Sequence, residues 1–188
     1  MQISKTNSIT LGGSVRAMKN IRVLVLCAIF VAMSIVLGKF LSFTAGPFRF
    51  SFENLSIIMS GVMFGPFAGL MVGLCADIVG CIAYGYTICP LITLGACCVG
   101  FFSGLSSTLL FKNNKALNVA FATAFAHIIG SMAVKSYALH TLYGTPMKTL
   151  LLRIPLYIVI GLFEGTIIYF VTTNKALSSQ LDRIYKKL

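Results

Sequence analysis

Runs of apolar residues, each about as long as a membrane-spanning helix, fill the chain between Ile21 and Thr172. A helix needs about 20 mainly apolar residues to cross the hydrocarbon core of a bilayer. Charged residues make up only 10% of the 188 residues, and the mean hydropathy is +0.93. A soluble domain carries about 25% charged residues. The sequence therefore predicts an all-α integral membrane protein, with no room for a separate soluble domain.

Six helices are expected to cross the membrane, separated by links that contain glycine, proline or charged residues. The second helix is expected to be short, because the sequence FGP at residues 64–66 must end or kink it. Expected outer loops are SFTAGPFRF, YGYTICP and HTLYGTP. The predicted spans are residues 21–41, 53–64, 67–83, 91–111, 117–139 and 147–172.

The net charge of +11 gathers at the ends of the predicted spans. Basic residues lie in the N-terminal 20 residues, in the loop KNNK (112–115) and in the C-terminal tail. Loops rich in Lys and Arg mark the cytoplasmic side of a membrane. We therefore expect a cytoplasmic N-terminal tail (1–20), a six-helix membrane domain (21–173) and a basic cytoplasmic tail (174–188). A nucleic-acid partner is not expected, since no basic stripe lies on a soluble face.

No catalytic, metal or cofactor motif is visible in the sequence. GxSxG, HExxH and Walker sequences are missing, so the chain is not expected to be an enzyme or to hydrolyse ATP. The six cysteines show no ligand spacing and are interpreted as packing residues, although a disulfide between Cys81 and Cys89 is conceivable. His127 has no second ligand at metal spacing and is interpreted as a core histidine.

Four ionisable residues map to the outer ends of three different predicted helices. They are Arg49, Glu53, Lys135 and Arg153. Ionisable groups within spans are costly unless they are paired or face a polar cavity. Their shared depth indicates a pocket that opens outward and suits an anionic ligand, because arginine can bind a carboxylate through two hydrogen bonds. Snorkelling at the interface, or internal pairs such as Glu53 with Arg49, is the alternative interpretation.

Other polar and aromatic residues allow two interpretations each. Asp77 lies deeper and could accept hydrogen bonds from a heterocycle or could pair with Lys135. Glu164, toward the middle or inner half of the last span, is explained at least as well by a structural pairing as by ligand contact. Stacking on an aromatic ligand or an interfacial belt would account for Phe52, Tyr84, Tyr86, Tyr137 and Tyr157.

Four segments of this sequence resemble the folate-specific, substrate-binding S components of energy-coupling factor transporters. The first is RFSFENLSIIMSGVMFGPFAGLMVGLCADIVG (49–80), and the others are GYTICPLITLGA, GSMAVKSYALHTLYGTP and LLRIPLYIVIGLFEG. The resemblance implies a six-helix bundle in a prokaryotic plasma membrane that captures folate from outside. It also implies a transmembrane coupling subunit and two ATPase subunits as partners.

The resemblance also assigns roles to residues. FENL, Lys135 and RIPLY point to the folate group, which adds Asn54 to the candidate site. Arg49, Lys135 and Arg153 would bind the glutamate tail of folate, and Asp77 its pterin ring. The AxxxA pair of Ala28 and Ala32 would dock onto the coupling subunit. The full candidate ligand site is Arg49, Phe52, Glu53, Asn54, Asp77, Tyr84, Lys135, Arg153 and Tyr157.

Three alternatives to folate capture remain open from the sequence. The ligand could be another vitamin or heterocycle, such as riboflavin or a pyrimidine precursor. An intramembrane enzyme that acts on lipid-linked substrates would need a nucleophile or a metal cluster that the sequence does not show. A channel or stand-alone transporter would typically show inverted repeats or helices interrupted in two corresponding halves, and only one GP break is visible.

Overall fold

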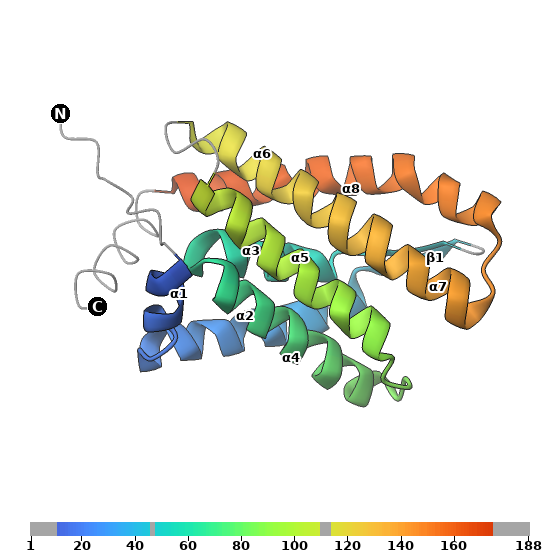
Figure 1. Cartoon of the computed structure of the whole chain (residues 1–188), viewed down its shortest axis with the longest axis horizontal. Coiled ribbons are helices and arrows are strands. Elements are labelled where there is room, and N and C mark those ends of the chain that lie inside the picture. Colours follow the sequence, from blue (N-terminus) through green and yellow to red (C-terminus); the bar gives the residue numbers. More distant parts are fainter. Residues whose placement is uncertain (1–10, 46–47, 110–113, 175–188) are drawn as a thin grey trace.

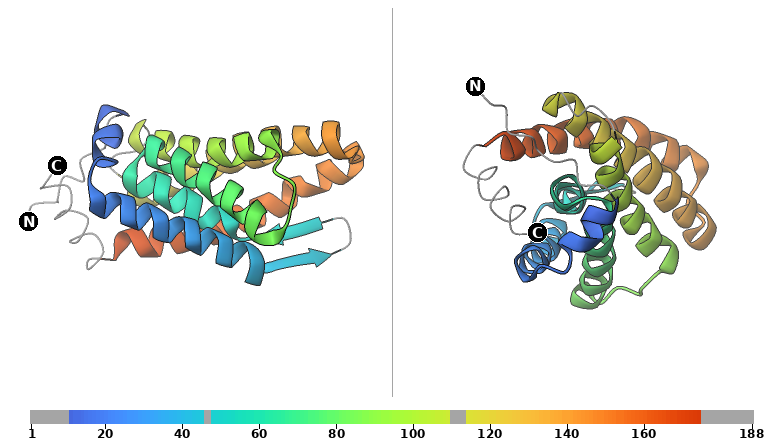
Figure 2. Two further views of the ribbon diagram at one scale, coloured as in Figure 1. Left: turned by 90° about the horizontal axis from the view of Figure 1, so that it is seen from below. Right: turned by 60° about the vertical axis from the view of Figure 1, so that its left-hand side comes forward.

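The computed structural model of the protein describes residues 11–45, 48–109 and 114–174. Its helices run back and forth along one long axis (Figure 1). α1, the start of α2 and the end of α8 lie at one end, and the β-hairpin lies at the opposite end with the link between α7 and α8 (Figures 1 and 2). The helices are α1 (Leu11–Ala17), α2 (Ile21–Phe40), α3 (Glu53–Phe64), α4 (Pro66–Tyr84), α5 (Pro90–Leu109), α6 (Lys115–Phe125), a π-helical segment η1 (Ala126–Val134), α7 (Lys135–Tyr143) and α8 (Met147–Thr173).

The predicted helices are present, and their bounds differ from the expected ones by a few residues. The fifth is one continuous rod made of α6, η1 and α7. Within the described residues, five helical segments are long and apolar enough to cross a membrane. α3 has 12 residues and is about 18 Å long at 1.5 Å per residue, shorter than the hydrocarbon core. The prediction that this second helix is short is confirmed.

Two elements were not expected. Residues 1–20 were interpreted as a polar tail, but Leu11–Ala17 form helix α1, and the side chains of Ser14 and Ala17 are buried. The expected outer loop at 42–50 contains strands β1 (Ser42–Ala45) and β2 (Phe48–Ser51), paired antiparallel. Residues 1–10 and 175–188 of the predicted tails lie outside the described residues.

The FGP sequence ends one helix and starts the next, as predicted. α3 ends at Phe64, Gly65 takes φ 90°, which favours glycine, and Pro66 occupies the first turn of α4. Ser14 of α1 stabilises this break: its Oγ donates to the Phe64 carbonyl at 3.1 Å and accepts from the Phe67 amide at 3.2 Å. The buried backbone groups that the break exposes are thereby satisfied.

Glycines hold α3, α4 and α5 in close contact. A Cβ at Gly69 of α4 would overlap the Gly100 carbonyl of α5, and a Cβ at Gly100 would overlap the Gly69 carbonyl. Gly73 meets the Ala96 carbonyl in the same way. Small residues that let helix backbones touch are the usual means of packing within a membrane, where no hydrophobic effect drives helices together. These three helices therefore form the tightly packed part of the fold.

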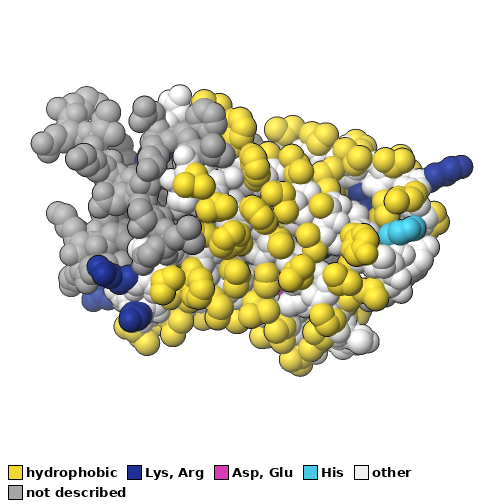
Figure 3. Space-filling view, viewed as in Figure 1, with side chains coloured by type: hydrophobic (Ala, Val, Ile, Leu, Met, Phe, Trp, Pro, Cys, Tyr) yellow, Lys and Arg dark blue, Asp and Glu magenta, His cyan; other side chains and the backbone are white. Residues whose placement is uncertain are grey.

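α8 is packed far more loosely than α3, α4 and α5. Of its 27 residues only Ile160, Glu164 and Ile168 are buried. On the face seen in Figure 3, apolar side chains cover the middle, and Lys and Arg side chains lie toward the two ends. This distribution matches a multi-pass membrane protein.

All six cysteines are free, including Cys81 and Cys89.

Candidate ligand-binding site

Lys135 lies at the centre of a buried polar cluster. Its Nζ donates to Glu53 Oε1 at 3.3 Å and to Asn54 Oδ1 at 3.4 Å, and Asn54 Nδ2 donates to Ser131 Oγ at 3.4 Å. Lys135 is 8% exposed, and its aliphatic stem crosses Gly95, where a Cβ would come within 2.6 Å of Lys135 Cγ. The cluster joins the start of α3 to the fifth span.

Glu53 also lies against the end of α2. A Cβ on Gly38 would be 3.3 Å from Glu53 Oε2 and 3.4 Å from Tyr84 Oη, and the Tyr84 hydroxyl donates to the Ile35 carbonyl. Ser34 Oγ donates to the Glu53 carbonyl at 2.8 Å. The side chains of Glu53 and Tyr84, two of the predicted site residues, thus both lie beside Gly38.

The π-helical segment aligns three buried polar residues of the fifth span. His127, Ser131 and Lys135 are 3%, 0% and 8% exposed and follow one another at intervals of four. In an α-helix four residues turn about 400°, so such a row drifts about 40° at each step. In η1 each hydrogen bond spans five residues instead of four: the Lys135 amide donates to the Gly130 carbonyl, five residues earlier. The wider turn reduces the drift and keeps the row facing the bundle.

Asp77 pairs with Thr93 of α5, whose Oγ1 donates to Asp77 Oδ2 at 2.6 Å. Lys135 forms its ion pair with Glu53, so the alternative that Asp77 is the hydrogen-bonded partner of Lys135 is wrong. Asp77 is only partly buried, and the Thr93 hydroxyl orients its carboxylate.

Arg153 and Tyr157 form a second polar group on α8. Arg153 Nη2 donates to Tyr157 Oη at 2.7 Å, and its guanidinium lies 5.2 Å from the centre of the Tyr157 ring. Arg153 Nη1 is buried and has no hydrogen-bond partner among the described residues. A buried donor without an acceptor is costly. An anionic ligand group at this position would remove that cost.

His127 and Glu164 form a buried pair, which confirms the structural pairing considered for Glu164. Nε2 of His127 and Oε2 of Glu164 are 2.8 Å apart, and the two residues are 3% and 0% exposed. The His127 ring also lies against Tyr157, with 5.5 Å between the ring centres. Of the described residues, no group of three or more His, Cys, Asp or Glu could hold a metal ion.

The remaining predicted residues lie around these groups. The Phe52 ring packs against Phe163 of α8, with centres 5.4 Å apart. Arg49 is in β2 opposite Thr44, and its side chain lies outside the described part of the structure. Ala28 and Ala32 are exposed on α2. The structure therefore brings Glu53, Asn54 and Lys135 together and places Phe52 beside them against α8, whereas the two alanines lie on the exposed face of α2.

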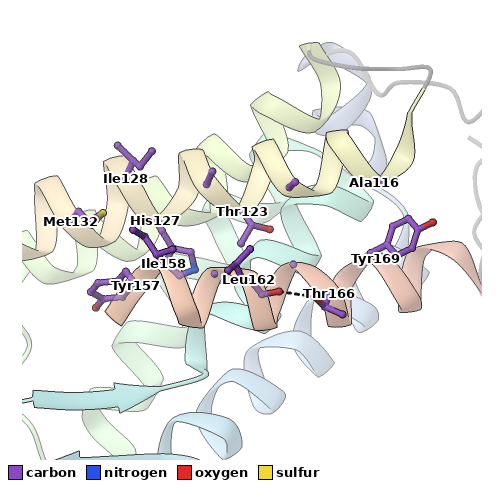
Figure 4. A pocket seen from close by; sticks show the side chains of 14 residues that line it. Ala116, Thr123, His127, Ile128, Met132, Tyr157, Ile158, Leu162, Thr166 and Tyr169 are labelled. Atoms are coloured by element: carbon purple, nitrogen blue, oxygen red, sulfur yellow. Dashed lines mark hydrogen bonds between the residues drawn. The ribbon is translucent and has the colours of Figure 1, made fainter. Parts of the chain in front are cut away.

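A groove runs between the α6–η1 rod and α8 (Figure 4). Its volume is about 390 Å³, and apolar or small side chains such as Ala116, Ile128 and Leu162 line most of it. Tyr157 and Met132 lie at one end of the groove with His127 close by, and Tyr169 and Ala116 lie at the other end. The groove separates the two helices along much of their length, which agrees with the loose packing of α8.

The sequence did not identify Thr93 and Ser131 as site residues, because Thr and Ser within a membrane span are usually interpreted as packing residues. Counting residues from the link between two antiparallel helices does not find Thr93: Asp77 is eight residues before the 85–89 link, whereas Thr93 is four residues after it. The same count does suit His127 and Glu164, which lie 17 residues before and 18 residues after the 144–146 link. Residues equally far from a link lie at a similar depth and are the first candidates for pairing.

Known proteins resemble this chain in both fold and sequence. The crystal structure of FolT bound with folic acid has the same fold, with a TM-score of 0.63 and 19% identity over 78% of this chain and 88% of that one. A protein named folate transporter FolT, from Clostridium novyi (strain NT), is 27% identical over 142 residues, which cover 71% of this chain and 77% of that protein.

The family match is the most extensive of these comparisons. Residues 18–178, nearly the whole chain, match the family described as the S component of the ECF-type riboflavin transporter. This confirms the resemblance to S components that the FENL and FGPFAG segments indicated. The protein belongs to the family of ECF-type riboflavin transporter S components, a membrane-embedded class of transporter subunits.

Proposed function

We propose that this protein is the membrane-embedded subunit that captures folate from outside the cell. The observation that carries the proposal is a pair of cations: Lys135, which is buried in its cluster, and the partly buried Arg153, whose Nη1 is buried and has no partner among the described residues. A ligand with carboxylates would supply acceptors to both, and charge-assisted hydrogen bonds are the strong ones. The glutamate tail of folate carries such carboxylates.

Riboflavin, the ligand in the family description, is the competing candidate. It has no carboxylate, so a riboflavin site has no need of buried cations. The relatives named for folate favour the same choice, since one is a folate transporter by name and another was crystallised with folic acid. Asp77, held by Thr93, offers a carboxylate acceptor for the amine and amide edge of a pterin.

The proposed topology has six spans with both termini in the cytoplasm of a prokaryotic cell. Counting the short helix α3 gives six passes, and the basic KNNK loop and C-terminal tail favour cytoplasmic ends. The hairpin and the α7–α8 link then face outward, and Lys135 and Arg153 lie in the halves of their spans that are nearer to that link. Energy for uptake would come from a transmembrane coupling subunit and two ATPases, as the resemblance implies for S components.

A ligand panel tests the proposal directly. The purified chain in detergent or nanodiscs is titrated with folate, riboflavin and a pyrimidine precursor, and binding is followed by calorimetry. Folate is expected to bind at least a hundredfold more tightly than riboflavin. Equal or tighter binding of riboflavin would overturn the proposal for folate. It would mean that Lys135 and Arg153 have a structural role and do not bind ligand carboxylates.

Asp77→Asn is expected to weaken folate binding at least tenfold while leaving the fold intact. The variant keeps the shape of the side chain but replaces one acceptor with a donor, and losing a hydrogen bond to a charged group costs about 1.5–3 kcal/mol. Affinity and thermal stability are measured on the same preparation. Asp77 has no part in recognition if the folded variant binds folate like the wild type.

Ala28→Trp is expected to separate binding from uptake. Ala28 and Ala32 are exposed on α2, and small residues at this spacing let a partner helix approach closely. The variant should bind folate normally in isolation, yet copurify poorly with the coupling subunit and support little uptake in cells. Val159→Trp, at an exposed position on α8 and away from α2, is the control and should leave both binding and uptake unchanged. Normal uptake by the Ala28 variant would mean that Ala28 and Ala32 are not part of the surface that binds the coupling subunit.

A further inference from the structure

The polar groups of α8 connect the candidate ligand site to the middle of the membrane domain. Arg153 bonds to Tyr157, the Tyr157 ring packs on His127, and His127 bonds to Glu164. We propose that His127 and Glu164 are positioning residues for the ligand site: their bond fixes α8 against η1 and thereby sets the placement of Tyr157 and Arg153. The inference rests on the proposed function, because it takes Arg153 to be a ligand contact.

The pair is poorly explained as a source of stability. Both residues are almost completely buried, and Glu164 Oε1 and His127 Nδ1 have no hydrogen-bond partner among the described residues. Taking such groups out of water is costly, and replacing a buried pair by apolar residues of similar volume is often neutral or stabilising. A pair that is only half satisfied is therefore retained for something other than the free energy of folding.

The position of α8 depends on few other contacts. Besides Glu164, its buried residues are Ile160 and Ile168, and a groove of about 390 Å³ lies between residues 157–169 of α8 and the helices α6 and η1 (Figure 4). Apolar contacts of this kind allow a helix to slide or rotate. The bond at 2.8 Å fixes one point of α8, and Gly161 leaves the space that the His127 ring occupies, since a Cβ there would lie 3.2 Å from Cδ2.

Pro155 explains why the outer turn of α8 needs this support. Proline has no amide hydrogen, so the Leu151 carbonyl loses its bond within the helix and the helix is weakened at this point. Arg153 lies on the outer side of the break and Tyr157 on the inner side. Their hydrogen bond crosses the break, so the placement of Arg153 follows that of Tyr157, and Tyr157 in turn packs on His127.

The decisive variant is the double substitution His127→Leu with Glu164→Leu in the full chain. We expect its melting temperature to equal or exceed that of the wild type, while folate affinity falls at least tenfold. A merely structural pair would give the reverse result, with lower stability and unchanged affinity in the folded protein. Thr172→Val, which removes a hydroxyl that donates to the Ile168 carbonyl two turns beyond Glu164 on α8, is the control and should change neither quantity.

A second variant tests the bond itself. The double substitution His127→Gln with Glu164→Gln keeps a hydrogen bond between the two helices without charge, and folate affinity should return to within about threefold of the wild type. Wild-type affinity in the folded double leucine variant, or its failure to fold while the glutamine pair folds, would overturn the proposal. So would a folded glutamine pair that binds no better than the leucine pair. Failure of the proposed function would appear separately, as a wild-type protein that does not bind folate.

Discussion

Gly69→Ala should destabilise the protein by about 3 kcal/mol or more, the largest stability effect that we expect from a single methyl group. Overpacking usually costs about 1–3 kcal/mol, and here the new Cβ would meet the Gly100 carbonyl, which belongs to the backbone and cannot rotate away. α4 and α5 would have to separate along their closest contact. Thermal unfolding in detergent, followed by circular dichroism, measures the effect.

Gly80→Ala is the matched control in the same helix. A Cβ at Gly80 would lie 3.8 Å from Tyr84 and 3.9 Å from Ile35, which is ordinary contact. Alanine should therefore be tolerated, and its higher helix propensity could add about 0.5–1 kcal/mol of stability. Similar melting temperatures for the two variants would mean that α4 and α5 are not held together through Gly69.

Lys135→Met should reduce folate affinity by about tenfold to a hundredfold, the largest effect on binding that we expect from a single substitution. Methionine retains most of the stem that crosses Gly95 but removes the cation, and hydrogen bonds to charged groups contribute about 1.5–3 kcal/mol. The Glu53 carboxylate would also lose its ion-pair partner and would repel an anionic ligand. Calorimetric titration with folate gives the change in affinity.

Lys148→Met provides the control for charge alone. Lys148 is exposed at the start of α8, outside the Lys135 cluster, so the same substitution there removes one positive charge without touching the candidate site. Its folate affinity should stay within about twofold of the wild type. If both lysine variants bind folate equally well, the Lys135 cluster is structural and the ligand carboxylates lie elsewhere.

The helices were predictable because the bilayer sets their length and because glycine, proline and charge mark their ends. The break at 64–66 is the clearest case, since a single tripeptide predicted both the end of α3 and the start of α4. The hairpin at 42–51 was not predicted. Its strands have only four residues each, and the sequence between them is the GP pair, so the local pattern favours a loop.

The candidate site was predictable in depth but not in its pairings. Counting residues from the membrane ends placed Glu53, Lys135 and Arg153 at one level. Which of them touch depends on the rotation of each helix about its axis, and a span that is apolar nearly all round gives little information on that rotation. For this reason the sequence suggested Lys135 as a partner of Asp77, whereas Thr93 is the residue that donates a hydrogen bond to the Asp77 carboxylate.

The π-helical segment determines how the fifth span responds to a change in its length. Each residue of an α-helix turns about 100°, and a residue in the wider turn of η1 turns by less. If one residue between Ala126 and Val134 were deleted and α-helical bonding resumed, the eight remaining residues would turn about as far as the nine residues do now. Lys135 would therefore stay near Glu53 while His127 kept its place beside Glu164. The segment thus absorbs one extra residue between two sites on one rod, and an aligned relative with a one-residue gap there would keep both sites if it retained their polar residues.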